Sequence, residues 1–158
     1  MTALADIKKR LADIATAEVF AALKTKAYAE SPASLTSVPT MIFTIGPQTY
    51  KPFADSEDIK LEQMVVYAKL MVIEVTQGIP GEAESAVEKL LEPCRDMFLA
   101  RPGLSLDADH GPLPLIKRSV LENTGGIAPI AFAEQMYLGV IYKLTIERIV
   151  QVTYAPGE

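Results

Sequence analysis

The stretch Tyr137-Leu-Gly-Val-Ile-Tyr-Lys-Leu-Thr-Ile-Glu147 alternates between two sets of side chains and predicts a long strand. Successive side chains of a strand point to opposite faces of its sheet, so a period of two is the signature of this element. One face is apolar and carries Leu138, Val140, Tyr142, Leu144 and Ile146; the other carries Gly139, Ile141, Lys143, Thr145 and Glu147. We expect this strand to close an α+β unit.

A second strand is expected from Leu61 to Thr76, and both of its faces are largely apolar. One face holds Val65, Tyr67, Met71, Ile73 and Val75, and the other holds Val66, Ala68, Leu70 and Val72. A strand that is apolar on both faces requires cover on both sides. Two helices can cover one face of a four-stranded sheet, so we expect neighbouring copies to cover the second face or a sheet edge.

Apolar residues at helical spacing predict two helices. The first lies within residues 3–26, and the second follows a stripe from Ala83 to Phe98 that includes Cys94. Pro93 is expected to kink or shorten the second helix. Shorter strands are expected at 38–45, which ends at Gly46-Pro47, and near 115–123, with an exposed loop or hairpin connection over 48–58. The expected fold is a single α+β domain over residues 1–158, a largely antiparallel sheet of about four strands with two main helices packed on one face.

Composition restricts the classes of partner. The net charge of −5 disfavours nucleic acid, and the short runs Lys8-Lys9-Arg10 and Lys117-Arg118 are too small to follow a phosphate backbone. The single cysteine, Cys94, cannot form an internal disulfide. No apolar run reaches the roughly 20 residues that a membrane-spanning helix needs. We therefore expect a protein made in a cytoplasm, without membrane or sequence-specific nucleic-acid binding.

Candidate chemical groups are few. Cys94 with His110 could form a nucleophile and base, but Cys94 lies on the apolar stripe of the second helix, where a thiol behaves as a small hydrophobe. Asp107, Asp109 and His110 could bind a metal, although polar turn residues that cap backbone groups explain the same cluster more simply. No catalytic, cofactor-binding or metal-ligating residue is therefore predicted.

The candidate functional residues belong instead to a protein interface. Tyr50 and Phe53 stand among Gly46, Pro47 and Pro52, and aromatic anchors on loops are typical of protein contacts. The alternative is that both rings fold back onto the core. The long loops at 46–60 and 101–114 are the expected contact regions, and the predicted interface residues are Tyr50, Phe53, Asp55, Glu57, Arg101, Asp107 and His110.

The order of elements resembles the small tail terminator and neck proteins of long-tailed bacteriophages. The resemblance is carried by the amphipathic first helix, the extended strand that ends near Val75, the helix Glu82-Ala-Glu-Ser-Ala-Val-Glu-Lys-Leu-Leu91 and the closing Tyr137-Leu-Gly-Val-Ile-Tyr-Lys-Leu144. It implies a non-enzymatic virion subunit without cofactors. Such subunits form a ring, usually hexameric, that caps the tail tube, joins it to the head–tail connector protein and lets DNA pass through. The resemblance also implies assembly in the host cytoplasm.

Other functions remain open from the sequence. The nearest alternative is a head-completion or neck adaptor protein of the same particle. A small non-viral ligand-binding domain or enzyme would use Asp107, Asp109 and His110 or Cys94, and an assembly chaperone would bind its partner only transiently.

Overall fold

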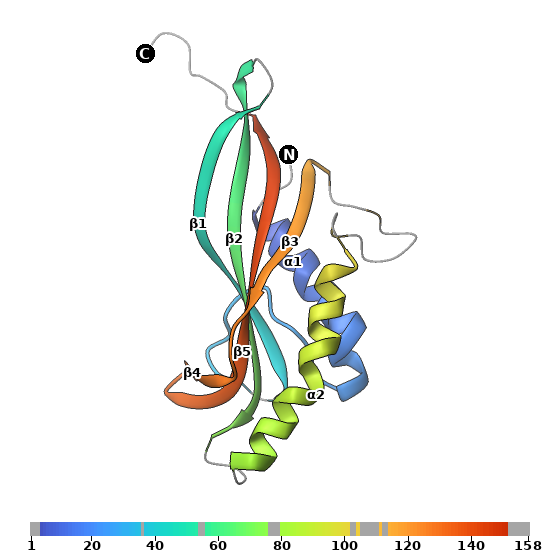
Figure 1. Ribbon diagram of the computed structural model, residues 1–158, viewed down its shortest axis with the longest axis vertical. Helices are drawn as coiled ribbons and strands as arrows, with labels where there is room; N and C mark the ends of the chain where they lie inside the picture. Colours follow the sequence, from blue (N-terminus) through green and yellow to red (C-terminus); the bar gives the residue numbers. More distant parts are fainter. Residues whose placement is uncertain are drawn as a thin grey trace.

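Two long antiparallel strands form the centre of the sheet. The computed structural model describes residues 4–35, 37–53, 56–75, 80–101, 104, 111 and 114–151, without the side chains of 56–58 and 80. Strand β2 (Ser56–Glu74) pairs with β5 (Gln135–Gln151) from Ile59 opposite Gln151 to Glu74 opposite Tyr137. The antiparallel sheet has five strands in the order β1-β2-β5-β3, with β4 also paired to β5 (Figure 1). The outer strands are β1 (Thr40–Phe53), β3 (Ile116–Thr124) and β4 (Ala128–Phe132).

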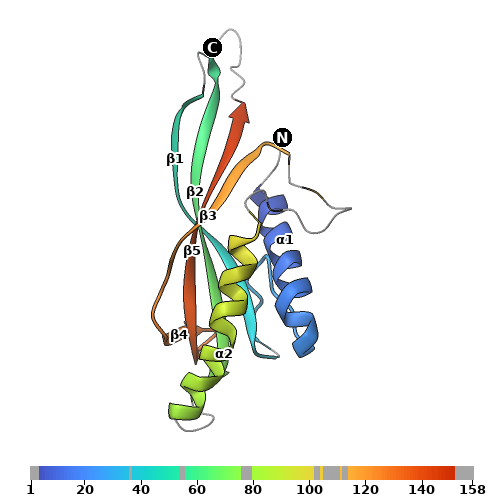
Figure 2. The same ribbon diagram turned by 45° about the vertical axis from the view of Figure 1, so that its right-hand side comes forward.

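Both long helices lie on one face of the sheet (Figure 2). The first, α1 (Leu4–Ala15), continues through a π-helical turn η1 (Thr16–Phe20) and a 3₁₀ turn η2 (Ala21–Leu23); the second is α2 (Pro80–Leu99). Their apolar stripes meet the inner face of the sheet in one core cluster. At its centre the Phe98 ring lies edge-on to Phe43, with centroids 6.3 Å apart, and 5.6 Å from the Tyr142 ring. The predicted α+β class and the antiparallel sheet are confirmed.

The predicted alternation of β5 is also confirmed. Val140, Tyr142, Leu144 and Ile146 are buried against the helices, whereas Lys143 and Thr145 lie on the other face and are half-buried. In β2, Val66, Ala68 and Leu70 are fully buried on the helix side. The helix side of both strands therefore forms the main core.

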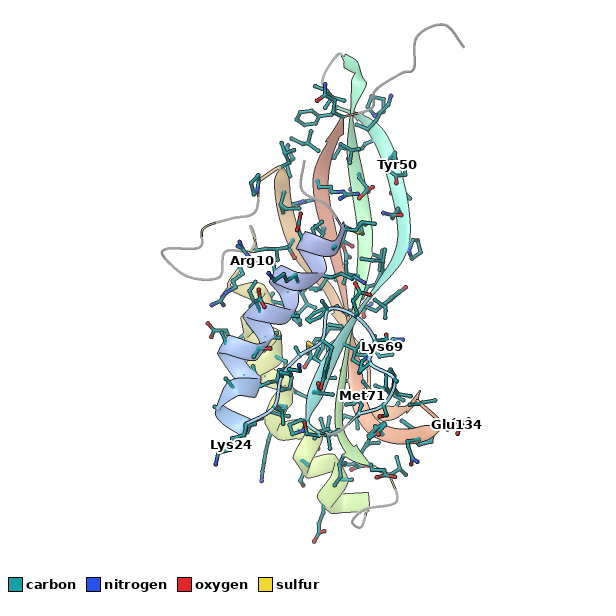
Figure 3. The ribbon with its side chains drawn as sticks, turned by 180° about the vertical axis from the view of Figure 1, so that it is seen from behind. Arg10, Lys24, Tyr50, Lys69, Met71 and Glu134 are labelled. Carbon is teal, nitrogen blue, oxygen red and sulfur yellow. The ribbon has the colours of Figure 1, made fainter. Side chains whose placement is uncertain are left out.

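The chain itself covers part of the second face of the sheet. Met71, Ile42, Ile130 and Tyr137 form a smaller buried cluster there, packed by Tyr28, Leu35, Val38, Phe132 and Ile141. Tyr28 is held by the β1 edge, because its N–H donates to the Met41 carbonyl (2.8 Å) and its own carbonyl accepts from the Phe43 N–H (3.2 Å). Figure 3 labels Met71 in this region, seen from behind. Cover of this part of β2 by neighbouring copies, as expected from the sequence, is therefore not required.

Three elements, β1, α2 and β4, differ from the expectation. The strand expected to end at Gly46-Pro47 bulges there and continues to Phe53, so residues 48–53 are not a loop but one arm of the β1–β2 hairpin. β1 is an edge strand. On its outer side no further strand of the described residues pairs with it, so a proline that lacks an N–H there removes no hydrogen bond from the sheet. Helix α2 runs through Pro93 to Leu99 without being shortened. Finally, β4 is a fifth strand that the sequence does not predict, because Gly125-Gly126 precede it and Pro129 lies within it.

Gly139 is expected to tolerate no side chain. A Cβ atom at this position would lie 1.8 Å from the Leu70 carbonyl oxygen, beside the bulge at which β2 and β5 shift register. Gly139→Ala should lower the free energy of unfolding by about 1–3 kcal/mol, because the backbone must move to relieve the overlap. Gly126→Ala is the matched control, since nothing lies within 4 Å of its added atom. Urea unfolding of both variants checks this, and equal losses would contradict the close approach.

Candidate functional site

The sheet extends beyond the helices at the end where β1 and β2 join, and its outer face there has no cover from described residues (Figure 1). The lining residues come from four strands and enclose a shallow depression of about 300 Å³. We call this surface the open sheet face; it consists of Pro47, Thr49, Gln63, Val65, Arg118, Val120, Glu122, Lys143, Thr145 and Glu147. It lies on the face of the sheet opposite the helices.

One row of paired residues crosses the open sheet face. Thr49, Gln63, Glu147 and Arg118 are neighbours in register across β1, β2, β5 and β3. The Arg118 guanidinium donates from Nε (2.9 Å) and Nη2 (2.8 Å) to Glu147 Oε1, and Gln63 Nε2 donates to the same oxygen (3.2 Å). Hydrogen bonding by Arg118 holds the pKa of Glu147 below its ordinary value of 4.5. These hydrogen bonds hold the side chains of Arg118, Glu147 and Gln63 in place along the depression.

The next row crosses the helix side of the sheet and contains a buried ion pair. Tyr50, Glu62, Arg148 and Ile116 are neighbours in register. Arg148 donates from Nε to Glu62 Oε1 (2.7 Å) and from Nη2 to Oε2 (3.3 Å), and Glu62 is 1% exposed. A hydrogen bond with Glu62 raises the pKa of Tyr50, whose side chain is otherwise 58% exposed. The pair therefore orients an exposed aromatic ring on the sheet edge, where Figure 3 labels Tyr50.

The open sheet face combines ordered polar groups with apolar side chains. Glu147 is tied to Arg118 and Gln63, and Val65 and Val120 give the depression an apolar part. Within the described ranges, no group of His, Cys, Asp and Glu side chains could hold a metal ion. Apolar patches bordered by ordered polar groups are the usual composition of protein interfaces.

The predicted interface residues have different positions. Tyr50 is exposed and Phe53 is half-buried, with Lys117 Nζ 5.2 Å from its ring centroid; both lie on β1 rather than on a loop. Arg101 forms an ion pair with Glu18 of η1, which ties the end of α2 to the first helix. Asp55, Asp107 and His110 lie outside the described residues, and so does the side chain of Glu57. Of the residues that the structure describes, Tyr50 and Phe53 share β1 and Arg101 lies after the end of α2.

Cys94 is fully buried beneath α2, as its place on the apolar stripe predicted. Burial raises the pKa of its thiol to about 12, so the thiol is neutral at pH 7. The neighbouring Tyr142 hydroxyl donates to the Leu91 carbonyl oxygen (3.0 Å), and burial raises the pKa of Tyr142 as well. Both groups pack the core rather than face a substrate.

Sequence reasoning did not identify the two Glu–Arg pairs. Glu62 and Arg148 interrupt otherwise apolar faces, and this is the signal that could have marked them. Alternation places a residue on a face of its own strand, but only the register between strands shows which side chains meet.

A comparison with protein-family models gives no match, and neither does a comparison with curated proteins. No helix in the described part of the chain is long and apolar enough to cross a membrane.

The Glu147–Arg118 contact should make stability depend on pH. Because the folded state lowers the pKa of Glu147, the contact stabilises the protein above pH 4.5 and is lost as the pH falls through the folded pKa. Arg118→Met should lower the free energy of unfolding at pH 7. The gap, meaning the difference in this free energy between the variant and wild type, should become smaller below pH 4.5. Urea unfolding across this range measures the gap, with Lys143→Met as the unpaired control on the same face. A gap that stays constant with pH would show that Glu147 does not depend on Arg118.

Removing Arg148 alone should lower the free energy of unfolding more than removing both Glu62 and Arg148. Arg148→Met leaves the buried Glu62 carboxylate without its guanidinium, and we expect a loss of about 3–5 kcal/mol. The double variant Glu62→Leu with Arg148→Met should regain much of this stability, since no buried charge remains. Denaturant unfolding of both variants tests the pair, and equal losses would contradict a desolvation penalty on Glu62.

Proposed function

We propose that the protein is a structural virion subunit, a ring-forming tail terminator that caps the phage tail tube and forms the joint between head and tail. The observation that carries the proposal is the open sheet face. Part of the outer face of the sheet is packed by the chain itself, and another part presents Val65 and Val120 with ordered polar groups around them. A subunit that repeats in a ring uses such a face for its neighbour.

Other features support a role in assembly. The order of elements resembles the tail terminator and neck proteins, and the sheet projects beyond its helices as an arm that a neighbour or a tube could contact (Figure 1). Tyr50 and Leu99 are 58% and 59% exposed, and large exposed side chains of this kind are typical anchors of protein contacts. The acidic balance of the chain suits a ring through which DNA passes without binding.

Electron microscopy of the purified protein tests the ring directly. We expect closed rings, and we expect their addition to growing tail tubes to stop elongation. Rings that bind the head connector but do not stop tube growth would instead indicate a neck adaptor. A protein that remains monomeric at high concentration would overturn the ring.

Tyr50 gives a sharper test of the contact with the tube. Tyr50→Ala and Tyr50→Phe both remove the hydroxyl that bonds to Glu62, but only Tyr50→Ala removes the exposed ring. We expect both variants to form rings and only Tyr50→Ala to lose tube binding, by roughly tenfold or more for an aromatic anchor. Binding of rings to immobilised tubes measures the difference. Equal binding by the two variants would exclude the Tyr50 ring from the contact.

A further inference from the structure

Strand β3 forms one margin of the sheet, and its outer edge is open to a further strand. The sheet order places β1 at one margin and β3 at the other, beside β5 (Figure 1). No strand of the described residues pairs with the outer side of β3. An edge strand presents a row of unpaired backbone N–H and C=O groups. The β1 edge is interrupted by Pro47 and Pro52, whereas β3 contains no proline from Ile116 to Thr124 and retains every backbone donor.

The exposed side chains of β3 change sign about its centre. Val120 is 36% exposed, Arg118 precedes it by two residues and Glu122 follows it by two, and all three line the open sheet face. Arg118 donates to Glu147 through Nε and Nη2, and its Nη1 forms no hydrogen bond with a described residue. Glu122 forms no hydrogen bond or ion pair in the described part of the chain. The pKa of Arg118 is raised chiefly by hydrogen bonding to Glu147, and Glu122 of the same chain contributes least.

Bulges limit the part of β3 that a second strand can follow. Its pairing with β5 is regular over 118–121 and shifts between Ile116 and Arg118 and again between Leu121 and Asn123. A bulge disturbs the regular spacing of backbone groups along its strand. An added strand therefore meets a short edge that has Val120 near its middle.

Antiparallel pairing of two β3 strands about Val120 joins groups of opposite charge. A two-fold axis at this residue places Arg118 of each copy opposite Glu122 of the other, with the two Val120 side chains opposite each other. Cross-strand pairs of opposite charge stabilise a sheet. Moving the axis to residue 119 or 121 separates Arg118 from Glu122, so one register is favoured over its neighbours.

The same axis separates the helices of the two copies. The sheet of one copy extends beyond its helices at the end where β1 and β2 join (Figure 1). Because antiparallel strands point in opposite directions, the projecting ends of the two copies lie at opposite ends of the joined sheet. The two helix layers are then displaced from each other along the strand direction.

We propose that the edge of β3 pairs with β3 of a second copy of this chain about a two-fold axis at Val120, with Arg118 of each copy opposite Glu122 of the other. A two-fold contact uses the same residues on both copies and closes with two chains. It therefore does not depend on the proposed ring. No β3 edge remains free in the pair. Few residues of each strand meet, so the contact belongs to the small and weak class of interfaces.

A cysteine on the axis tests the contact even when it is weak. Val120→Cys places two thiols opposite each other, and a mild oxidant should join them in a disulfide that non-reducing electrophoresis detects. The native Cys94 does not compete, because it is buried and its pKa is raised to about 12. Glu134→Cys, in the exposed β4–β5 turn, is the control for random collisions (Glu134 is labelled in Figure 3). We expect Val120→Cys to form the disulfide roughly tenfold faster than this control, because paired thiols have a high effective concentration.

Two further variants test the register. Arg118→Cys alone and Glu122→Cys alone should react no faster than the Glu134→Cys control, because the two thiols of such a pair are about 13 Å apart along the strands. An equal mixture of Arg118→Cys and Glu122→Cys should form the mixed disulfide faster than either variant alone, since position 118 of one copy lies opposite position 122 of the other. Thermal melts confirm that each variant is folded.

The outcomes separate this contact from the ring. Rapid cross-linking at position 120 together with the mixed disulfide would support the paired β3 strands. A Val120→Cys variant that reacts no faster than Glu134→Cys would overturn them, even if electron microscopy shows rings. Single variants at 118 and 122 that react as fast as their mixture would overturn the antiparallel register. Cross-linked pairs in a protein that forms no rings would support this contact and overturn the ring.

Discussion

The antiparallel pairing of β2 with β5 is the constraint on which the rest of the structure depends. The two strands stay in register over almost their whole length, interrupted by a single shift beside Gly139. Because register fixes which side chains share a face, it places Val66, Leu70, Val140 and Leu144 together under the helices. The same register brings Glu62 to Arg148 and Gln63 to Glu147 in consecutive rows, one on each side of the sheet.

Those consecutive rows place one ion pair on the buried helix side of the sheet and one on its outer side. On the helix side, a carboxylate buried with a guanidinium costs desolvation and is tolerated only with good geometry, which the bidentate Glu62–Arg148 pair provides. On the outer side, the Arg118–Glu147 pair is partly open to water, and the Arg118 side chain is 60% exposed. The inner pair therefore orders the projecting end of the sheet, while the outer pair shapes the surface that it presents.

The sequence predicted the elements better than it predicted their contacts. Alternation in 137–147 and the double apolar character of 61–76 identified the central strands correctly, because burial leaves a strong periodic pattern. The hairpin arm over 48–53 was missed because Gly46-Pro47 is a typical strand terminator, and only its place at a sheet edge allows the strand to bulge and continue. The sequence left open whether Tyr50 and Phe53 are exposed or packed on the core, and in the structure Tyr50 is exposed and Phe53 is half-buried. The Glu–Arg pairs depend on strand register, and sequence pattern alone does not contain this information.

The proline-bearing edge of β1 has a consequence for aggregation. An unpaired strand edge is a template on which other chains can add as cross-β layers. Pro47 and Pro52 each lack a backbone N–H donor, and the bulge at Gly46-Pro47 interrupts the regular strand. Fibril growth is thereby hindered along this margin. The β1 edge therefore disfavours cross-β association even at high protein concentration.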